Sequence, residues 1–226
     1  MTDRLSIYNG ALALCGERRL ASLTEDREPR YLLDDAWNNG GVRYCLEQGQ
    51  WRFATRSAAL DYDTSIIPDF GYRRAFSKNT DWVSTIAVCT DEFYRSPLLQ
   101  YQDDALHIYA DYDTIYVRYI SDGATFGTNY AFWPESFREF VEAHFASKIV
   151  FKLTGAEAKA KYLLGSDLTG QRNGILSSRR KIAKNKNAQL EPTQFPAQGG
   201  WTRARQGSGG RRGPMGDGGS SGSLTG

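Results

Sequence analysis

The stretch that decides the fold reads LSIYNGALALCGERRL (residues 5–20), ASLTEDREP (21–29), RYLLDDAWNNGGVRYCLEQG (30–49) and QWRF (50–53). Its apolar residues recur at helical spacing on both sides of a short polar loop, and the block ends on aromatic residues. It therefore predicts a helix, a loop, a long second helix and an aromatic exit. No residue combination in it is typical of an active site. The block indicates two packing surfaces joined by a fixed elbow, as in an assembly protein.

Local signals predict where these two helices begin and end. Thr2 or Asp3 can cap the start of the first helix, and Gly16 can end it. Thr24 is the expected N-cap of the second helix, because acidic residues follow it in the turn where the helix dipole favours anions.

Residues 38–41, Asn-Asn-Gly-Gly, leave two interpretations of the second helix open. Each glycine in a helix interior costs roughly 1 kcal/mol relative to alanine, so the helix can break there. Alternatively, the helix continues and the glycines let a neighbouring backbone approach closely. Leu33, Trp37, Tyr44 and Cys45 keep an apolar face on both sides of the stretch, and this periodicity favours a continuous helix.

The middle of the chain has the composition of β-structure. β-Branched and aromatic residues predict strands at 82–88, 105–110 and 114–120, with Asp111-Tyr112-Asp113 as the turn between the last two. Ile115, Val117 and Tyr119 should then face one side of the sheet. The segments 62–80 and 121–132 are expected to be loops, and the whole region to be a small antiparallel sheet or a pair of hairpins.

Helical signals return after residue 132. Pro134 and Glu135 suit the first turn of a third helix, which Gly155 should end. A fourth helix is expected from Ala156 to about Asn187, although glycines interrupt it. The predicted fold class is α+β, mainly helical, with about four helices and an inserted antiparallel β region.

Composition limits the classes of function. The three cysteines are odd in number and widely spaced, which favours reduced, buried thiols in a cytoplasmic setting over disulfides or a zinc site. No catalytic cluster, metal site or cofactor is expected. No apolar run is long enough to span a membrane, and the N-terminus lacks a signal-peptide pattern.

Charge is distributed unevenly along the chain. Residues 171–226 carry ten Lys or Arg against two acidic residues, whereas the preceding residues are net acidic. The last 28 residues also hold 11 of the 23 glycines. The C-terminal segment, 189–226, is therefore expected to be an extended arm attached to a globular body, 1–188. Opposite charge on body and arm favours contact with other copies or with an acidic partner.

Four motifs together resemble the head-to-tail adaptor family of tailed phages, the tail tubular protein A or portal-connector group of short-tailed viruses. They are LSIYNGALALCGERRLASLTEDREP (5–29), YCLEQGQWRF (44–53), WPESFREFVEAHFASKIVFKLTG (133–155) and GGWTRARQG (199–207). The chain departs from the family pattern at residues 38–41 and at the glycines of the fourth helix.

The resemblance implies a helical bundle with an inserted β region at about 53–130. It also implies a dodecameric ring in the virion, assembled in the host cytoplasm. In such a ring the C-terminal arm contacts the portal protein, the tail nozzle protein binds below, and neighbouring copies surround the channel. DNA would pass through that channel without sequence-specific binding, and no membrane is involved.

The expected partner-binding residues lie in the arm. Arginines can form bidentate pairs with acidic partner residues, and an aromatic side chain can fill a pocket. The candidates are Phe195, Trp201, Arg203, Arg205, Arg211 and Arg212. Two other functions stay open: nucleic-acid binding by the basic tail and, with less support, cell-wall hydrolysis.

Three further features have ordinary structural interpretations. Trp51 and Phe53 are expected to cap a core rather than anchor an interface. The basic residues 179–186 are expected to be a solvated helix end, and His144 a satisfied, semi-buried histidine.

Overall fold

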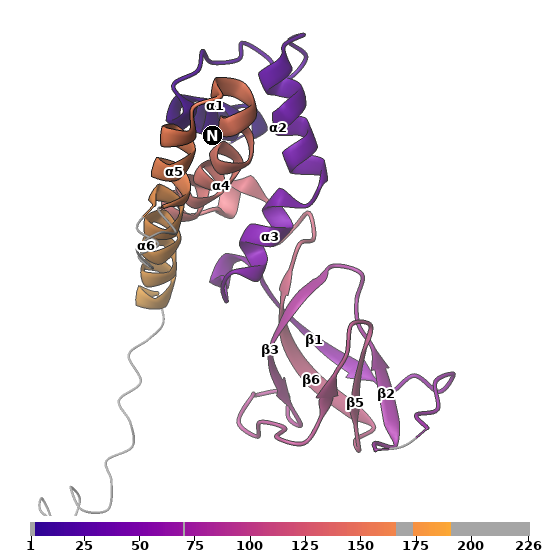
Figure 1. Ribbon diagram of the computed structural model, residues 1–226. Helices are drawn as coiled ribbons and strands as arrows, with labels where there is room; N and C mark the ends of the chain where they lie inside the picture. Colours follow the sequence, from indigo (N-terminus) through magenta and orange to yellow (C-terminus); the bar gives the residue numbers. More distant parts are fainter. Residues whose placement is uncertain (1–2, 70, 166–173, 191–226) are drawn as a thin grey trace, which may run out of the picture. The chain divides into compact units, whose positions relative to one another are not determined.

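The computed structural model describes residues 3–69, 71–165 and 174–190. Within them the fold is mixed α+β, with six α-helices and two small antiparallel sheets (Figure 1). The helices are α1 (Arg4–Cys15), α2 (Glu28–Asn38), α3 (Gly41–Glu47), α4 (Glu135–Thr154), α5 (Glu157–Leu164) and α6 (Ile175–Gln189). The strands are β1 (Thr55–Asp61), β2 (Arg74–Ser77), β3 (Trp82–Cys89), β4 (Gln102–Asp103), β5 (His107–Ala110) and β6 (Thr114–Ser121).

The predicted ends of α1 and α4 are confirmed. Asp3 caps α1 in a capping box, in which its Oδ1 accepts a hydrogen bond from the Ser6 backbone N–H at 2.7 Å. Gly16 ends α1 with a left-handed φ of 76°, and Gly155 ends α4 in the same way with φ 59°. Pro134 precedes α4, where it removes a backbone N–H that the first turn does not use.

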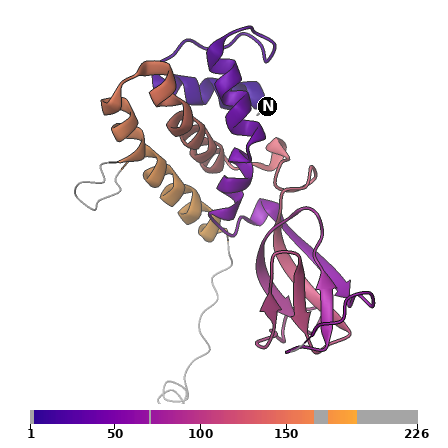
Figure 2. The ribbon, with the colours of Figure 1, turned by 45° about the vertical axis from the view of Figure 1, so that its right-hand side comes forward.

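Helix α4 is the centre of the helical part, because it contacts each of the other five described helices. Figure 2 shows it between the α2–α3 segment, in indigo and purple, and the orange α5–α6 segment. Its buried aromatic residues Phe137, Phe140 and Phe145 pack into one core with α1, α3 and Trp51. The Phe137 and Trp51 rings lie 4.8 Å apart, edge to face.

The second helix is not continuous, so the favoured interpretation of residues 38–41 was wrong. Gly40 adopts φ +79°, a left-handed conformation that no α-helix interior allows, and α3 begins at Gly41. The start was also wrong. Helix α2 begins at Glu28 with Pro29 in its first turn, and Thr24 lies in the preceding loop.

The expected fourth helix is also two helices. Helix α5 ends at Leu164, and Gly165 follows with φ +95°. A positive φ at that point stops the helical hydrogen-bond series, and α6 begins only at Ile175. The α-helices of the described residues therefore number six, rather than about four, because glycines interrupt two of the four expected segments.

The β region contains two three-stranded sheets, with the orders β1-β6-β3 and β2-β5-β4. The strands predicted at 82–88, 105–110 and 114–120 are present as β3, β5 and β6. Residues 111–113 do not close a hairpin, because β5 and β6 belong to different sheets. Strands β1, β2 and β4 were not predicted, and β2 lies inside the segment 62–80 that was expected to be a loop.

Strand β6 has the predicted two-faced character. Ile115, Val117 and Tyr119 are buried in the core of the β region, whereas Ile120 faces the other way and belongs to the helical core. Arg43 of α3 adds a polar link between the two cores. Its guanidinium donates to the Trp82 carbonyl oxygen at 2.7 Å and pairs with the Asp122 carboxylate.

The three cysteines are buried free thiols, as predicted. Burial raises the pKa of the Cys15 thiol to about 11, and burial also raises the pKa of Cys45. Both thiols therefore stay protonated and weakly nucleophilic at neutral pH.

Candidate functional site

The predicted partner-binding residues Phe195, Trp201, Arg203, Arg205, Arg211 and Arg212 all lie outside the described residues. The predicted arm begins at residue 189, of which the structure describes Gln189, the last residue of α6, and Leu190.

Trp51 belongs to the core, as predicted. Its side chain is buried, its indole N–H donates to the Cys45 carbonyl oxygen at 3.0 Å, and its ring contacts Phe137. Phe53 is partly buried and packs 4.8 Å from the same Phe137 ring. Neither aromatic side chain is free to anchor a partner.

The basic residues of α6 divide into two groups. Arg179 donates to the Glu139 carbonyl oxygen of α4, and Arg180 donates to the Gln48 side chain just after α3. These two arginines attach α6 to its neighbours, so the expectation of a fully solvated end was wrong for them. Lys181, Lys184 and Lys186 are exposed, as expected.

Large apolar side chains are exposed in the segments that follow β1 and β3. Ile67 and Leu99 are each 87% exposed, and Phe93 is 67% exposed. Asp61 at the end of β1 lies opposite Thr114, and Cys89 at the end of β3 lies opposite Tyr116, so both segments leave the same end of the first sheet. We call Ile67, Phe93 and Leu99 the loop-end apolar residues.

The loop that carries Phe93 is held in place by hydrogen bonds. Asp91 Oδ1 accepts from the Ser96 backbone N–H at 2.7 Å, and the Tyr94 hydroxyl donates to the Val117 carbonyl oxygen at 3.0 Å. Tyr94 has a left-handed φ of 57° in this loop. Phe93 is therefore exposed on a loop whose conformation is fixed by hydrogen bonds.

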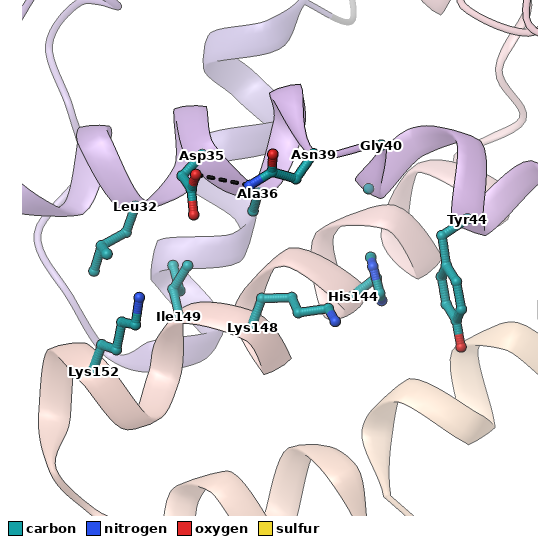
Figure 3. Close-up of a pocket in the computed structure, with 11 residues that line it drawn as sticks. Leu32, Asp35, Ala36, Asn39, Gly40, Tyr44, His144, Lys148, Ile149 and Lys152 are labelled. Carbon is teal, nitrogen blue, oxygen red and sulfur yellow. Dashed lines mark hydrogen bonds between the residues drawn. The ribbon is translucent and has the colours of Figure 1, made fainter.

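A cavity of about 360 Å³ lies between α4 and the junction of α2 with α3. Its walls include apolar Leu32, acidic Asp35, aromatic Tyr44 and three nitrogen-bearing side chains of α4: His144, Lys148 and Lys152 (Figure 3). The three α4 residues are spaced four apart, so they share one face of the helix. Figure 3 shows Lys148 extending toward His144 and the Lys152 amine pointing toward α2.

The break between α2 and α3 shapes this cavity. Gly41 packs so closely that an added Cβ would lie 2.6 Å from both the Ala36 carbonyl oxygen and the Phe145 ring. The new helix then brings the Tyr44 ring onto the His144 ring, with centroids 4.5 Å apart and planes 17° from parallel. The helix break thus places the Tyr44 ring over the His144 imidazole.

His144 is neutral and incompletely paired. Its side chain is only 4% exposed, and no described residue forms a hydrogen bond with its Nδ1. Burial, aided by the nearby positive charge of Lys148, lowers the pKa of the imidazole to about 4. The expectation of a satisfied histidine was wrong for this nitrogen. Sequence reasoning missed the cavity because residues far apart in the chain form it.

Glu142 is the second buried titratable group of α4. Burial raises the pKa of its carboxyl to about 7, against the opposing effect of Arg138 and Arg179. The carboxyl packs against α1, where a Cβ added to Gly10 would lie 2.2 Å from it. It therefore faces helix backbone rather than open space.

No group of three or more His, Cys, Asp or Glu in residues 3–69, 71–165 and 174–190 is placed to hold a metal ion. Among the same residues, none of the helices has the length and apolar character needed to cross a membrane.

No family model matches this chain, and no curated protein matches it.

Proposed function

We propose that this protein is a head-to-tail adaptor of a short-tailed phage. In this proposal it forms a homo-oligomeric ring in the virion, docks under the portal protein through the arm 189–226, receives the tail nozzle protein and surrounds the DNA channel. It acts as a structural protein, without catalysis. The observation that carries the proposal is the set of loop-end apolar residues, which are exposed on the two segments that leave one end of the first sheet.

Covering a large exposed apolar side chain with the surface of a partner is favourable. Burial of one such side chain contributes roughly 1.5–3 kcal/mol, so covering all three would contribute several kcal/mol to association. The ordered Asp91–Ser96 loop adds to this, because a preorganised loop loses little conformational freedom on binding. In the proposal, this surface contacts the nozzle protein or a neighbouring copy.

The helical part supports the same proposal. We infer that α1, α2–α3, α4 and α5–α6 act as the four-helix bundle of the connector resemblance, with two of its members interrupted by glycines. The support is the central position of α4, which contacts the other five described helices. Such a body can pack side by side with copies of itself while the β region reaches other partners.

A size measurement tests this function. The isolated protein should be monomeric or weakly associated, and it should form a ring when the portal protein of the same virus is added. Electron microscopy of the mixture should show the ring beneath the portal. A tight dimer that stays unchanged when portal is added would contradict the proposal.

Nucleic-acid binding by the basic tail is the second candidate. It is favoured by the exposed Lys181, Lys184 and Lys186, which lie on α6 just before the arm. Binding of this kind should weaken steeply with added salt, because it releases counterions from the phosphates. If deletion of residues 190–226 leaves DNA affinity unchanged, the tail is not the binding element.

Cell-wall hydrolysis has less support. Such an enzyme needs two carboxyl groups flanking a cleft, one of them with a raised pKa. Glu142 has the raised pKa, but its carboxyl packs against α1 and pairs with Arg138. A peptidoglycan assay against a heat-inactivated control tests this candidate.

A further inference from the structure

A groove of about 460 Å³ lies between the first turn of α4 and the last turns of α6. Of its apolar lining residues, Trp51 and Phe137 are buried, whereas Ile182 is 48% exposed and Leu190 is 61% exposed. The α6 residues 182 and 186 are one helical turn apart, so they face the groove together. Its volume lies in the range of pockets that bind small molecules, so the groove can accept an aromatic ring.

Side chains of opposite charge line this groove. Glu135 and Glu139 come from α4, and Lys186 comes from α6. The Glu139 carboxylate is 43% exposed and lies 3.9 Å from the Arg179 guanidinium, which leaves it accessible to a second cation. Within residues 3–69, 71–165 and 174–190, the Lys186 ammonium forms no ion pair. The groove therefore has an apolar centre with negative charge on one helix and positive charge on the other.

The loop that carries Phe93 has the matching arrangement. Phe93 is 67% exposed, and the Arg95 guanidinium lies 5.5 Å from the centre of its ring. Glu92 precedes Phe93 and is also exposed. Neither the Glu92 carboxylate nor the Arg95 guanidinium forms an ion pair with another residue that the structure describes. The loop therefore presents an aromatic ring that an acidic and a basic side chain flank in sequence.

Charge complementarity favours a second copy of this chain as the occupant of the groove. When Phe93 enters the groove, Glu92 can pair with the neighbour's Lys186, and Arg95 can pair with the neighbour's Glu139. Complementary charges of this kind orient an interface and disfavour wrong partners. Hydrogen bonds already fix the Phe93 loop, so binding costs it little conformational freedom.

The loop and the groove are different surfaces of the same chain. Phe93 follows β3 in the β region, whereas the groove belongs to α4 and α6. A contact between two different surfaces is heterologous, and repeated heterologous contacts build a ring when the rotation closes. This geometry agrees with the ring of the proposed function.

We propose that Phe93 of one copy inserts into the α4–α6 groove of a neighbouring copy. In that contact, Glu92 pairs with the neighbour's Lys186, and Arg95 pairs with the neighbour's Glu139. The neighbour's Ile182 and Leu190 cover the Phe93 ring. This inference rests on the proposed function, because it supplies the contact between neighbouring copies of the ring.

Cross-linking of two full-length cysteine variants tests the contact. Glu92→Cys and Lys186→Cys are mixed and treated with a short bis-maleimide, because two long paired side chains can exceed the roughly 7 Å between Cα atoms that a disulfide allows. The chain's own cysteines are buried and should react slowly. The mixture should give a covalent dimer, whereas each variant alone should give several-fold less, since the contact joins two different surfaces.

Lys181→Cys replaces Lys186→Cys in the control mixture. Lys181 is an exposed lysine of the same helix, but it does not line the groove. The unchanged protein, treated in the same way, gives the background. The proposal is overturned if the control mixture gives as much dimer as the first mixture, or if the first mixture gives no dimer above background.

Charge reversal tests the pairing of Glu92 with Lys186. Glu92→Lys and Lys186→Glu should each reduce self-association, measured by sedimentation at high protein concentration, about threefold, because like charges then face each other. A chain with both changes should recover the association of the unchanged protein, because the attraction returns with its signs exchanged. Failure to recover would contradict the pairing.

Removal of the aromatic ring tests the apolar part of the contact. Phe93→Ser should reduce association roughly tenfold or more, because the ring no longer becomes buried in the groove. Leu106→Ser is the matched control, since Leu106 is 70% exposed but lies outside both the Phe93 loop and the groove. Equal association by the two variants would overturn the proposal.

Failure of this contact and failure of the adaptor function give different results. If portal protein drives ring formation but the Glu92→Cys and Lys186→Cys mixture gives no dimer, the adaptor function is supported and the Phe93 contact is wrong. If the dimer forms but portal protein has no effect on assembly, the contact is supported and the adaptor function is wrong.

Discussion

Gly40 and Gly41 are adjacent, but they are required for different reasons. Gly40 has φ +79° and open space around the position of a Cβ, so its requirement is conformational. Gly41 has no left-handed φ, and its requirement is space, because the Ala36 carbonyl oxygen and the Phe145 ring occupy the place of a Cβ. The two positions therefore form a matched pair for mutation.

We expect Gly41→Ala to lower the free energy of unfolding by about 1–3 kcal/mol, since α3 must shift away from α2 and Phe145. Gly40→Ala should cost about 1–2 kcal/mol from the left-handed conformation alone. Gly40→Asn should cost less than Gly40→Ala, because Asn tolerates that conformation. Urea denaturation measures all three. If Gly40→Asn were as damaging as Gly40→Ala, the conformational explanation would fail.

Glu142 and His144 make opposite contributions to the pH dependence of stability. The pKa of Glu142 is raised to about 7, so its contribution is full below about 4.5 and is lost as pH rises toward 7. The pKa of His144 is lowered to about 4, so its contribution is full above about 6.5 and is lost as pH falls toward 4. Between about pH 4.5 and 6.5, the two contributions to the free energy of unfolding change in opposite directions and partly cancel.

Glu142→Gln should remove the contribution of Glu142 and leave that of His144 in the pH dependence of stability. Relative to the unchanged protein, the variant should gain about 2.5 kcal/mol between pH 5 and pH 8, because the glutamine has no charge to bury. Unfolding free energies at the two pH values give this difference, and Glu139→Gln, at a half-exposed neighbouring site, is the control. A variant that follows the unchanged protein at both pH values would show that Glu142 is not the group responsible.

At the scale of elements, a partly buried carboxylate joins α1 to α2. Asp34 Oδ1 accepts from the Tyr8 hydroxyl at 2.8 Å and pairs with Arg4 at 2.6 Å, while Oδ2 pairs with Arg30 at 2.7 Å. Burial raises the pKa of Tyr8 well above its usual range, with the Asp34 hydrogen bond adding to the effect. The hydroxyl therefore stays a donor at all ordinary pH values.

Tyr8→Phe should destabilise the protein by about 1 kcal/mol, the usual net value of one hydrogen bond. Tyr31→Phe is the matched control, because the Tyr31 hydroxyl donates to Asp26 at an exposed site and should contribute little. Thermal denaturation of both variants compares them. If both variants lost the same stability, the Tyr8–Asp34 hydrogen bond between α1 and α2 would contribute no more than the exposed Tyr31–Asp26 hydrogen bond.

Elements with strong end signals could be predicted from the sequence, and the others could not. Asp3, Gly16, Pro134 and Gly155 each act within one turn of the chain, and the ends they predicted are correct for α1 and α4. Strand β1 was missed because its residues, TRSAALD, lack an apolar alternation. Its pairing with β6 supplies the structure instead.

The break at Gly40 was missed for a related reason. Apolar residues on both sides face the same neighbour, α4, so their periodicity continues although the helix does not. The cavity needed still more information, because Lys148 and Tyr44 come to line the same cavity only after α3 packs on α4. The sequence drew attention to His144, Tyr44 and residues 39–41 of its wall, but not to their proximity.

At the scale of the whole chain, the loop-end apolar residues make the proposed function testable without loss of the fold. The double change Ile67→Ser and Leu99→Ser should leave the melting temperature unchanged, because both side chains are almost fully exposed. Binding to the nozzle protein or between copies should fall roughly tenfold or more. Sedimentation measures the association.

Phe151→Ser is the control for that double change, since Phe151 is also exposed but lies on α4, outside the loop end. It should associate as the unchanged protein does. If the control weakens association and the double variant does not, the contact surface is on the helices.

The order of the first sheet has a consequence for synthesis on the ribosome. Strand β1 has β6 as its neighbour, more than fifty residues later in the chain, and α1 packs on α4, more than a hundred residues later. A nascent chain that has emerged only as far as β5 has neither partner available. The apolar faces of α1 and β1 therefore stay exposed until α4 and β6 have been synthesised. We expect chaperones to bind these faces during translation.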